Sequence, residues 1–259
     1  MQTMVYGPTL QATGAFDGGN ITEQKPIGFP GEGSVVKRVG PLFYWAWAHS
    51  KSDGYIGLHP HQAFEIMTYV VQGKAEHGDT LGTRSTVGPG GVQIMQTGSG
   101  VSHEERFIGP DMEAFQIWFE PHMESALKTK PTYNQYEHGE FPTVAGDGYV
   151  KKTVIGQDAP VEIVADARMW DVEIQPGREY RHTVPADRTL TALAIRGAGT
   201  WTNGSSDASS TTAFHHKDFI VAPADAAVET VIHATEQGPL RLILIEVPTK
   251  VDYPLYPKR

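Results

Sequence analysis

The segment 57–79, GLHPHQAFEIMTYVVQGKAEHGD, decides how the rest of the chain is interpreted. It places His59 and His61 immediately before a run rich in β-branched and aromatic residues, which is typical of a strand. Side chains two positions apart in a strand point to the same side, so both imidazoles are expected to face one interior. Pro60 has no amide hydrogen, which suits a strand start or a bulge. The segment therefore indicates half of a metal site on a β-sheet.

A second pair with the same spacing stands in GSGVSHEERF, residues 98–107. His103 and Glu105 are again two positions apart at the end of a predicted strand, so they are expected to point to one side. Glu104 lies between them and is expected to point the other way, so it is not predicted as a ligand. The segment between the two pairs contains enough turns for two or three strands, which would bring the pairs together in a small barrel.

Three imidazoles and one carboxylate make a donor set of nitrogen and oxygen. Such a set suits Fe(II), Mn(II), Ni(II), Cu(II) or Zn(II) and leaves one or two coordination positions for substrate or dioxygen. Open positions are typical of catalytic rather than structural metal sites. The candidate ligands of one divalent metal are therefore His59, His61, His103 and Glu105.

The other histidines have no second candidate ligand at a suitable spacing and are predicted to have ordinary structural or surface roles. His77 falls in what looks like a hairpin turn, EHGDTLG, and is predicted to be solvated. His215 and His216 are adjacent, so they are expected to point to opposite sides. His182 has no second histidine two positions later. The same interpretation covers His49, His122, His138 and His233.

Short runs of β-branched and aromatic residues, separated by glycine and proline turns, recur along all 259 residues and predict an all-β fold of sandwiches or barrels. Two similar halves are indicated, because a strand–glycine–strand pattern recurs in each. The polar stretch 130–148 is predicted to separate them. HMESALKTK, 122–130, is the best helical candidate, and NGSSDASSTT, 203–212, is predicted to be a flexible hairpin loop without function.

Composition limits the class of protein. Cysteine is absent, so a metal must be held by nitrogen and oxygen ligands, and the composition fits a cytoplasmic protein. The sequence shows no basic and apolar N-terminal leader and no apolar run of roughly 20 residues, so neither a signal peptide nor a membrane span is predicted. The net charge of −9 and the pI of 5.6 disfavour direct binding to nucleic acid.

The order of several motifs resembles that of the pirin family, a branch of the bicupins. The corresponding stretches are HPHQAFEIMTYVVQGKAEHGD, GPGGVQIM, TGSGVSHEE and FQIWFEP, within residues 55–121. The chain departs from the family pattern at Gln62, Ala63 and Gly91, where a basic residue, a glycine and an acidic residue are usual. These departures leave all four candidate ligands in place.

The resemblance implies a bicupin, with two antiparallel β-barrel (double-stranded β-helix) domains packed face to face. Residues 1–130 would form an N-terminal metal-binding cupin, and residues 131–259 a C-terminal cupin without metal. A single metal, commonly iron, would be held by the residues that match the family ligands, which are His59, His61, His103 and Glu105. Iron(II) is therefore expected first, with Mn, Ni, Cu and Zn as alternatives.

The resemblance also implies an activity, because several pirins are similar to quercetin 2,3-dioxygenases. The expected reaction is metal-dependent dioxygenation of a quercetin-like flavonol or a related enolic aromatic substrate, with Glu105 as the proton acceptor. Phe64, Met95 and Trp118 are candidates to flank a flat substrate, although an ordinary core role is favoured for them. Two alternatives stay open: an iron-binding, redox-sensitive regulator acting through a protein partner, and an oxygen-independent cupin isomerase or lyase.

Overall fold

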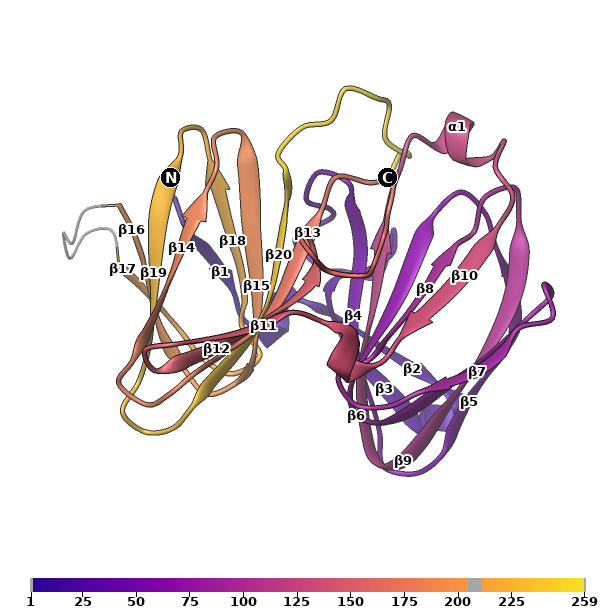
Figure 1. The fold of residues 1–259 in the computed structure, drawn as a ribbon, viewed down its shortest axis with the longest axis horizontal. Helices are drawn as coiled ribbons and strands as arrows, with labels where there is room; N and C mark the ends of the chain where they lie inside the picture. The colour runs from indigo at the N-terminus through magenta and orange to yellow at the C-terminus, as the bar shows by residue number, and fades with distance from the viewer. Residues whose placement is uncertain (1, 205–210, 259) are drawn as a thin grey trace. The chain divides into compact units, whose positions relative to one another are not determined.

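The computed structural model describes residues 2–204 and 211–258, and almost all of their regular structure is antiparallel β-sheet (Figure 1). The prediction of an all-β, antiparallel protein is confirmed. The chain folds into two compact units. The N-terminal unit comprises Gln11–Glu140, Ile163–Ala165 and Asp252–Arg259, and the C-terminal unit comprises Met1–Leu10, Phe141–Glu162 and Asp166–Val251.

The N-terminal unit is built on a sheet that contains nine strands within the described residues. Its hydrogen-bonded order is β10-β8-β6-β9-β4-β3-β2, with β5 paired to β9 and β7 paired to β6. The strands are β2 (Ala12–Phe16), β3 (Ile21–Ile27), β4 (Leu42–Ser50), β5 (Gly54–His61), β6 (Glu65–Asp79), β7 (Arg84–Val87), β8 (Val92–Gln96), β9 (Val101–Phe119) and β10 (Thr132–Tyr136). Between them lie the short helix α1 (Met123–Ala126) and 3-10 turns at Asp17–Gly19 and His138–Glu140.

Apolar side chains on one face of this sheet form the core of the N-terminal unit. One buried cluster contains Val70, Phe107 and Ala114, and another contains Tyr44 and Trp118. Much of β4 and the first part of β6 are buried at consecutive positions, so both faces of these strands are covered there. Burial of these side chains is the main driving force that holds the long strands β6 and β9 together.

β9 changes which of its residues face inward part-way along its length. Its pairing with β6 runs from Gln72↔Glu113 to Lys74↔Ile108, so two steps along β6 correspond to five along β9. The bulge therefore adds three residues (5 − 2) to β9, which is an odd number. Since side chains alternate between faces, odd-numbered residues face inward before the bulge and even-numbered residues after it.

The C-terminal unit contains two antiparallel sheets around one core, as far as its residues are described. A seven-stranded sheet has the order β1-β18-β15-β20-β13-β12-β11, and a four-stranded sheet has the order β14-β19-β16-β17. Side chains such as Leu190, Trp201 and Leu242 pack in one buried cluster. The strands are β1 (Met4–Tyr6), β11 (Thr143–Gly146), β12 (Tyr149–Ile155), β13 (Arg168–Ile174), β14 (Glu179–Val184), β15 (Arg188–Arg196), β16 (Gly199–Asn203), β17 (Thr211–Phe214), β18 (Phe219–Ala224), β19 (Val228–Ala234) and β20 (Leu240–Pro248), with a 3-10 turn at Pro8–Leu10.

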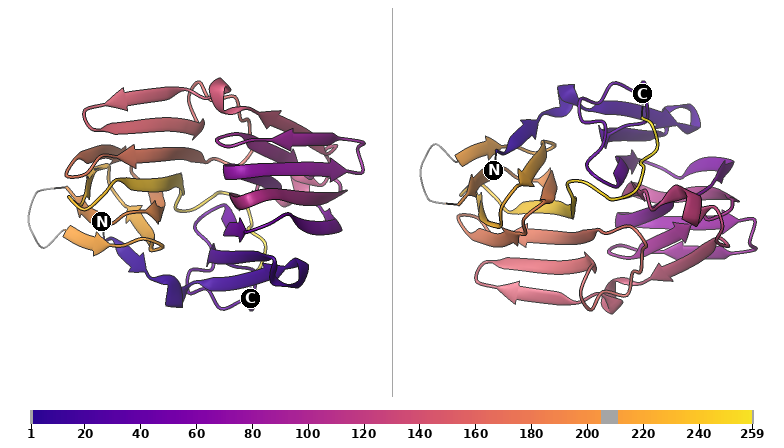
Figure 2. Two further views of the ribbon diagram at one scale, coloured as in Figure 1. Left: turned by 90° about the horizontal axis from the view of Figure 1, so that it is seen from below. Right: turned by 90° about the horizontal axis from the view of Figure 1, so that it is seen from above.

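Both ends of the chain join the unit that is remote in sequence. The indigo strand β1 pairs with β18 and lies beside the orange strands of the C-terminal unit (Figure 2). The yellow tail that follows β20 belongs to the N-terminal unit. There the Tyr253 hydroxyl donates to the carbonyl oxygen of Glu120 at 2.8 Å, and the Lys258 ammonium lies 4.3 Å from the centre of the Phe43 ring. Neither unit is therefore a continuous stretch of sequence.

Some predictions about individual segments can be compared with this fold. The helical prediction for 122–130 is confirmed for one turn, α1, which His122 caps by accepting a hydrogen bond from the Ser125 amide. In the predicted loop 203–212, residues 205–210 lie outside the described residues. No described helix has the length and apolar character that crossing a membrane requires. The double-stranded β-helix, the boundary at residue 130 and the face-to-face packing stay predictions.

Glu65 is a buried carboxylate that organises backbone around it. It accepts hydrogen bonds from the amides of Val164 (2.6 Å) and Ala165 (2.9 Å) and from the side chain of Gln96 (2.8 Å). Because Glu65→Ala would remove three hydrogen bonds and leave the buried amide of Ala165 unsatisfied, we expect it to lower the free energy of unfolding by about 2–3 kcal/mol, measured by urea titration.

The matched control is Glu76→Ala on the same strand. The Glu76 side chain is 42% exposed and its ion pair with Arg106 is 3.7 Å long, so we expect a change below about 0.5 kcal/mol. Equal losses in the two variants would contradict a special role for the buried carboxylate.

Candidate metal centre

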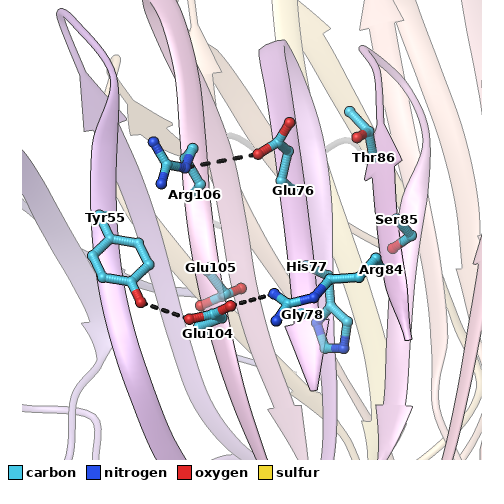
Figure 3. A pocket seen from close by; sticks show the side chains of 10 residues that line it. All are labelled: Tyr55, Glu76, His77, Gly78, Arg84, Ser85, Thr86, Glu104, Glu105 and Arg106. Carbon is cyan, nitrogen blue, oxygen red and sulfur yellow. Dashed lines mark hydrogen bonds and ion pairs between the residues drawn. The ribbon is translucent and has the colours of Figure 1, made fainter. Parts of the chain in front are cut away.

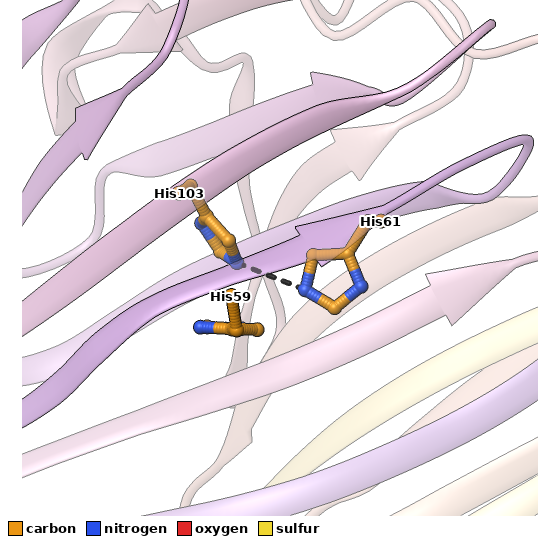
Figure 4. Close-up of side chains that lie close together, drawn as sticks. All are labelled: His59, His61 and His103. Carbon is orange, nitrogen blue, oxygen red and sulfur yellow. Dashed lines mark hydrogen bonds between the residues drawn. The ribbon is translucent and has the colours of Figure 1, made fainter.

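β5 and β9 bring the three predicted histidine ligands together. The two strands are antiparallel neighbours, and His59 of β5 lies directly opposite His103 of β9. His61 lies two residues beyond His59, on the same side of β5. Figure 4 shows the three rings gathered close to one another. The spacing of the histidines in the sequence is thus converted by strand pairing into a cluster of imidazoles.

The ring nitrogens converge closely enough to hold one ion. One nitrogen from each of His59, His61 and His103 lies within 4.8 Å of the other two, and the structure describes no second group of this kind among residues 2–204 and 211–258. The Nε2 atoms of His61 and His103 are 3.1 Å apart. Metal–nitrogen bonds of about 2.0–2.1 Å at right angles place two nitrogens about 3 Å apart. These two atoms therefore fit neighbouring coordination positions.

A hydrogen bond sets the tautomer of His59. Its Nδ1 lies 2.8 Å from the carbonyl oxygen of Gly57. A carbonyl oxygen can only accept, so Nδ1 carries the hydrogen and donates. The opposite nitrogen, Nε2, is then unprotonated and available to a metal, which is the usual arrangement of a ligating imidazole.

Burial keeps the other two imidazoles neutral. The pKa of His61 is lowered to about 3, first by burial and then by the neighbouring His103 and His59. The pKa of His103 is also lowered to about 3, first by burial and then by His59 and His77. At neutral pH both rings therefore present lone pairs rather than positive charges. Unprotonated imidazole is the form that binds metals, so the donor set fits a divalent cation.

Glu105 is buried in the same unit but is held by hydrogen bonds. It is 2% exposed. The Thr68 hydroxyl donates to its Oε1 at 3.1 Å, and the Gln116 amide donates to its Oε2 at 2.8 Å. Glu105 is not among the residues whose ligand atoms gather within 4.8 Å of one another. Its roles as fourth ligand and as proton acceptor therefore stay predictions.

Glu104 lies on the outward face of the sheet that carries the histidines (Figure 3). Its carboxylate accepts a hydrogen bond from the Tyr55 hydroxyl at 2.6 Å and forms an ion pair with Arg84. The hydrogen bond from Arg84, followed by that from Tyr55, lowers the pKa of Glu104. These partners lie along a surface hollow of about 510 Å³. Glu104 therefore interacts with polar and charged side chains at the surface, which supports leaving it out of the ligand set.

The prediction that His77 is solvated in a turn is wrong. β6 continues to Asp79, so His77 lies within a strand, and the turn begins after it. His77 is 5% exposed, its Nε2 lies 2.9 Å from the Asp79 carboxylate, and its ring stacks on Tyr133 with centroids 4.2 Å apart. Gly78 and Asp79 are typical turn residues, which is why the sequence EHGD suggested a turn. His77 packs beside His103, with ring centroids 5.4 Å apart.

An aromatic wall, formed by Phe43, Phe64 and Trp118, borders the imidazoles. Trp118 lies edge-on to His61 with ring centroids 4.8 Å apart, and Phe64 packs against Trp118 at 5.4 Å. Phe43 packs against Phe64 at 4.6 Å. Met95 is buried in the same apolar cluster as Trp118. The residues predicted either to flank a substrate or to form core are thus core residues that also reach the metal centre.

A hollow of about 550 Å³ leads from the surface to His61. Its lining is mostly small and polar, and consists of Pro60, His61, Gln62, Thr80, Gly100, Val101 and Ser102. Gln62, which replaces the usual basic residue, therefore stands beside the metal centre without adding a charge. Ala63, which replaces the usual glycine, has a φ of +67°, a left-handed conformation that explains why glycine suits this position.

Sequence reasoning did not identify Thr68 and Gln116, the two partners of Glu105. These residues lie opposite each other on β6 and β9. Glu105 and Gln116 have opposite parity along β9, so a regular strand would place them on different faces. The odd-numbered bulge puts both inside. The sequence feature that could have identified them is a polar residue within an apolar run, Thr68 in EIMTYVV and Gln116 in FQIWF.

Comparison with known proteins places this site within a family. Residues 44–119 match the family model described as pirin. A pirin-like protein from Solanum lycopersicum is 30% identical over 193 residues, which cover 72% of this chain and 63% of that protein. A quercetin 2,3-dioxygenase from Escherichia coli strain K12 is 29% identical over 148 residues, covering 54% of this chain and 59% of that protein. The aligned part thus spans less than two thirds of these relatives.

The solved structures show the same fold over nearly the whole chain. A bacterial pirin from Escherichia coli, solved in complex with nickel(II), has a TM-score of 0.75 and 21% identity, covering 95% of this chain and 99% of that chain. The resemblance to pirins that the motifs indicated is confirmed.

The lowered histidine pKa values predict how the stability of the metal-free protein depends on pH. In the unfolded chain His61 and His103 take up protons near pH 6.5, whereas in the folded state they do so near pH 3. Between these values the unfolded state binds more protons, so stability falls as the pH falls. We expect the urea midpoint of chelator-treated protein to decrease between about pH 7 and pH 5.

The matched measurement uses His61→Leu, which removes one of the two buried titrating groups. This variant should show a shallower decrease of the midpoint over the same pH range. An unchanged slope, or a midpoint that rises on acidification, would contradict the burial of neutral imidazoles.

Proposed function

We propose that this chain, which contains a pirin-family domain over residues 44–119, is a metal-dependent dioxygenase that acts on quercetin-like flavonols or a related enolic aromatic substrate. The observation that carries this proposal is the convergence of three imidazoles beside an aromatic wall and an open hollow. The naming of a relative in Escherichia coli as a quercetin 2,3-dioxygenase supports the substrate class. Small-molecule substrate and dioxygen would be the partners.

His59, His61, His103 and Glu105 would hold the metal. When bound, the divalent ion supplies Lewis acidity that favours the deprotonated hydroxyl of the substrate. We take iron(II) as the first candidate, with Mn, Ni, Cu and Zn compatible with the same donors. The nickel(II) complex of a structurally similar bacterial pirin supports the proposal that this chain binds a metal, without deciding its identity.

The protein's own residues would bind and orient the substrate and take its proton. The planar rings of Trp118 and Phe64 offer a surface against which a flat aromatic substrate can pack. Gln62 at the entrance provides a neutral amide that can bond to hydroxyl groups. Glu105 would accept the hydroxyl proton, because it is a buried carboxylate two residues from His103 on the same strand. The hollow beside His61 provides the approach for both reactants.

A cytoplasmic location, the lack of direct nucleic-acid binding and the lack of membrane association stay predictions that follow from composition and charge. The alternative is a redox-sensitive regulator that acts through a protein partner. The following experiment distinguishes this regulator from the dioxygenase.

The test measures metal content and oxygen uptake on the same purified samples. Plasma mass spectrometry should find a metal in the wild type that is lost in His61→Ala, because that variant removes one of three converging nitrogens. Oxygen consumption with quercetin and a panel of enolic phenols should fall at least about 100-fold in the same variant. His233→Ala, which changes an exposed histidine of the C-terminal unit, should affect neither quantity.

Two results would contradict the proposal. Metal that is retained in His61→Ala at the wild-type level would refute the site. Metal that depends on His61, together with no oxygen uptake for any phenol, would refute the dioxygenase and favour the regulator or the oxygen-independent enzyme.

A further inference from the structure

Two hydrogen bonds connect the aromatic wall to Glu105, and a third reaches Glu105 from Thr68. The indole Nε1 of Trp118 donates to Oε1 of Gln116 at 3.1 Å. Nε2 of Gln116 donates to Oε2 of Glu105 at 2.8 Å, and the Thr68 hydroxyl donates to Oε1 of Glu105 at 3.1 Å. Trp118 in turn contacts the ring of His61. This series of hydrogen bonds therefore begins and ends at residues of the candidate metal centre.

The chemistry of the donors decides the direction of each bond. An indole N–H can only donate, so the amide oxygen of Gln116 must face Trp118. The NH₂ group of Gln116 is then directed at Glu105, where it requires an acceptor. An oxygen of Glu105 provides that acceptor. Trp118 thus fixes the orientation of the Gln116 amide, and the amide NH₂ group fixes the position of the Glu105 side chain.

Glu105 occupies a position defined by these bonds rather than by the imidazoles. Its oxygens each accept one hydrogen bond, and it lies outside the group of three converging ring nitrogens. A carboxylate oxygen has two lone pairs, so each retains one for a further partner. Each oxygen can therefore also bind a metal or a proton while it keeps its hydrogen bond.

We propose that Gln116 is a positioning residue that holds Glu105 in its hydrogen-bonded, metal-free position, with Trp118 fixing the orientation of the amide. This inference rests on the proposed function, because it gives Glu105 the position from which it would accept the substrate's proton. Gln116 is partly exposed, whereas Glu105, Thr68 and Trp118 are buried. A substrate packed against Trp118 would therefore influence the carboxylate through Gln116.

The first test is Gln116→Leu, loaded with cobalt(II). Loss of the amide removes the bond to Oε2, so Glu105 is released toward the metal and the visible ligand-field absorption of cobalt changes. With quercetin and the native metal, we expect kcat to fall at least about tenfold while KM changes less than about threefold, because the proton acceptor and not the binding surface is altered. Metal content should stay at the wild-type level.

The matched control is Gln24→Leu. Gln24 is a partly buried glutamine of the same unit, but its amide donates to the side-chain oxygen of Gln11 at 2.8 Å and not to Glu105. It should leave the cobalt spectrum unchanged. Trp118→Phe keeps an aromatic ring and removes only the donor that orients Gln116, so it should shift the spectrum in the same direction as Gln116→Leu, by less. This variant tests the proposal even if Gln116→Leu does not fold.

A double-mutant cycle identifies Glu105 as the group that moves. In a Glu105→Gln background, Gln116→Leu should produce no further change in the cobalt spectrum. A wild-type cobalt spectrum in both Gln116→Leu and Trp118→Phe would overturn the proposal, as would a full spectral change in the Glu105→Gln background. Because the spectrum does not depend on turnover, it separates a failure of this inference from a failure of the dioxygenase proposal.

Discussion

The direct opposition of His59 and His103 across β5 and β9 is the contact on which the rest of the site depends. It brings two imidazoles from distant parts of the sequence to one point, and the spacing in HPH adds the third. His61 and His103 are neutral in this setting, because uncompensated charges that are removed from water are costly. The lowered pKa values of His61 and His103 express this constraint.

β9 supplies two groups of residues that surround this contact. Its first part carries His103 and Glu105, and its last part carries Gln116 and Trp118. The two parts face the same interior only because the bulge between them adds an odd number of residues. Bulges of this kind often re-aim side chains next to functional sites. The irregular middle of the strand is therefore as important for the site as its regular ends.

The sequence was sufficient for the features that follow from local periodicity. The i, i+2 spacing predicted that His59 and His61 share a side, and the turn-rich composition predicted an antiparallel all-β protein. The burial of His77 was missed, because EHGD resembles a turn and only the pairing of β6 with β7 and β9 shows that the strand continues. Gln116 was missed for a different reason: its direction depends on a bulge whose size is set by long-range pairing, which local residue preferences do not determine.

The tail that follows β20 affects the order in which this molecule can be completed during synthesis. Tyr253 and Lys258 contact Glu120 and Phe43 of the N-terminal unit, yet they are translated after the whole C-terminal unit. Phe43 packs on Phe64 in the wall beside the imidazoles. The ribosome therefore releases every candidate ligand and all three rings of the aromatic wall long before it releases the tail residues that contact Glu120 and Phe43. A nascent chain passes through a stage in which the histidines and the wall are present and the contacts from the tail are still missing.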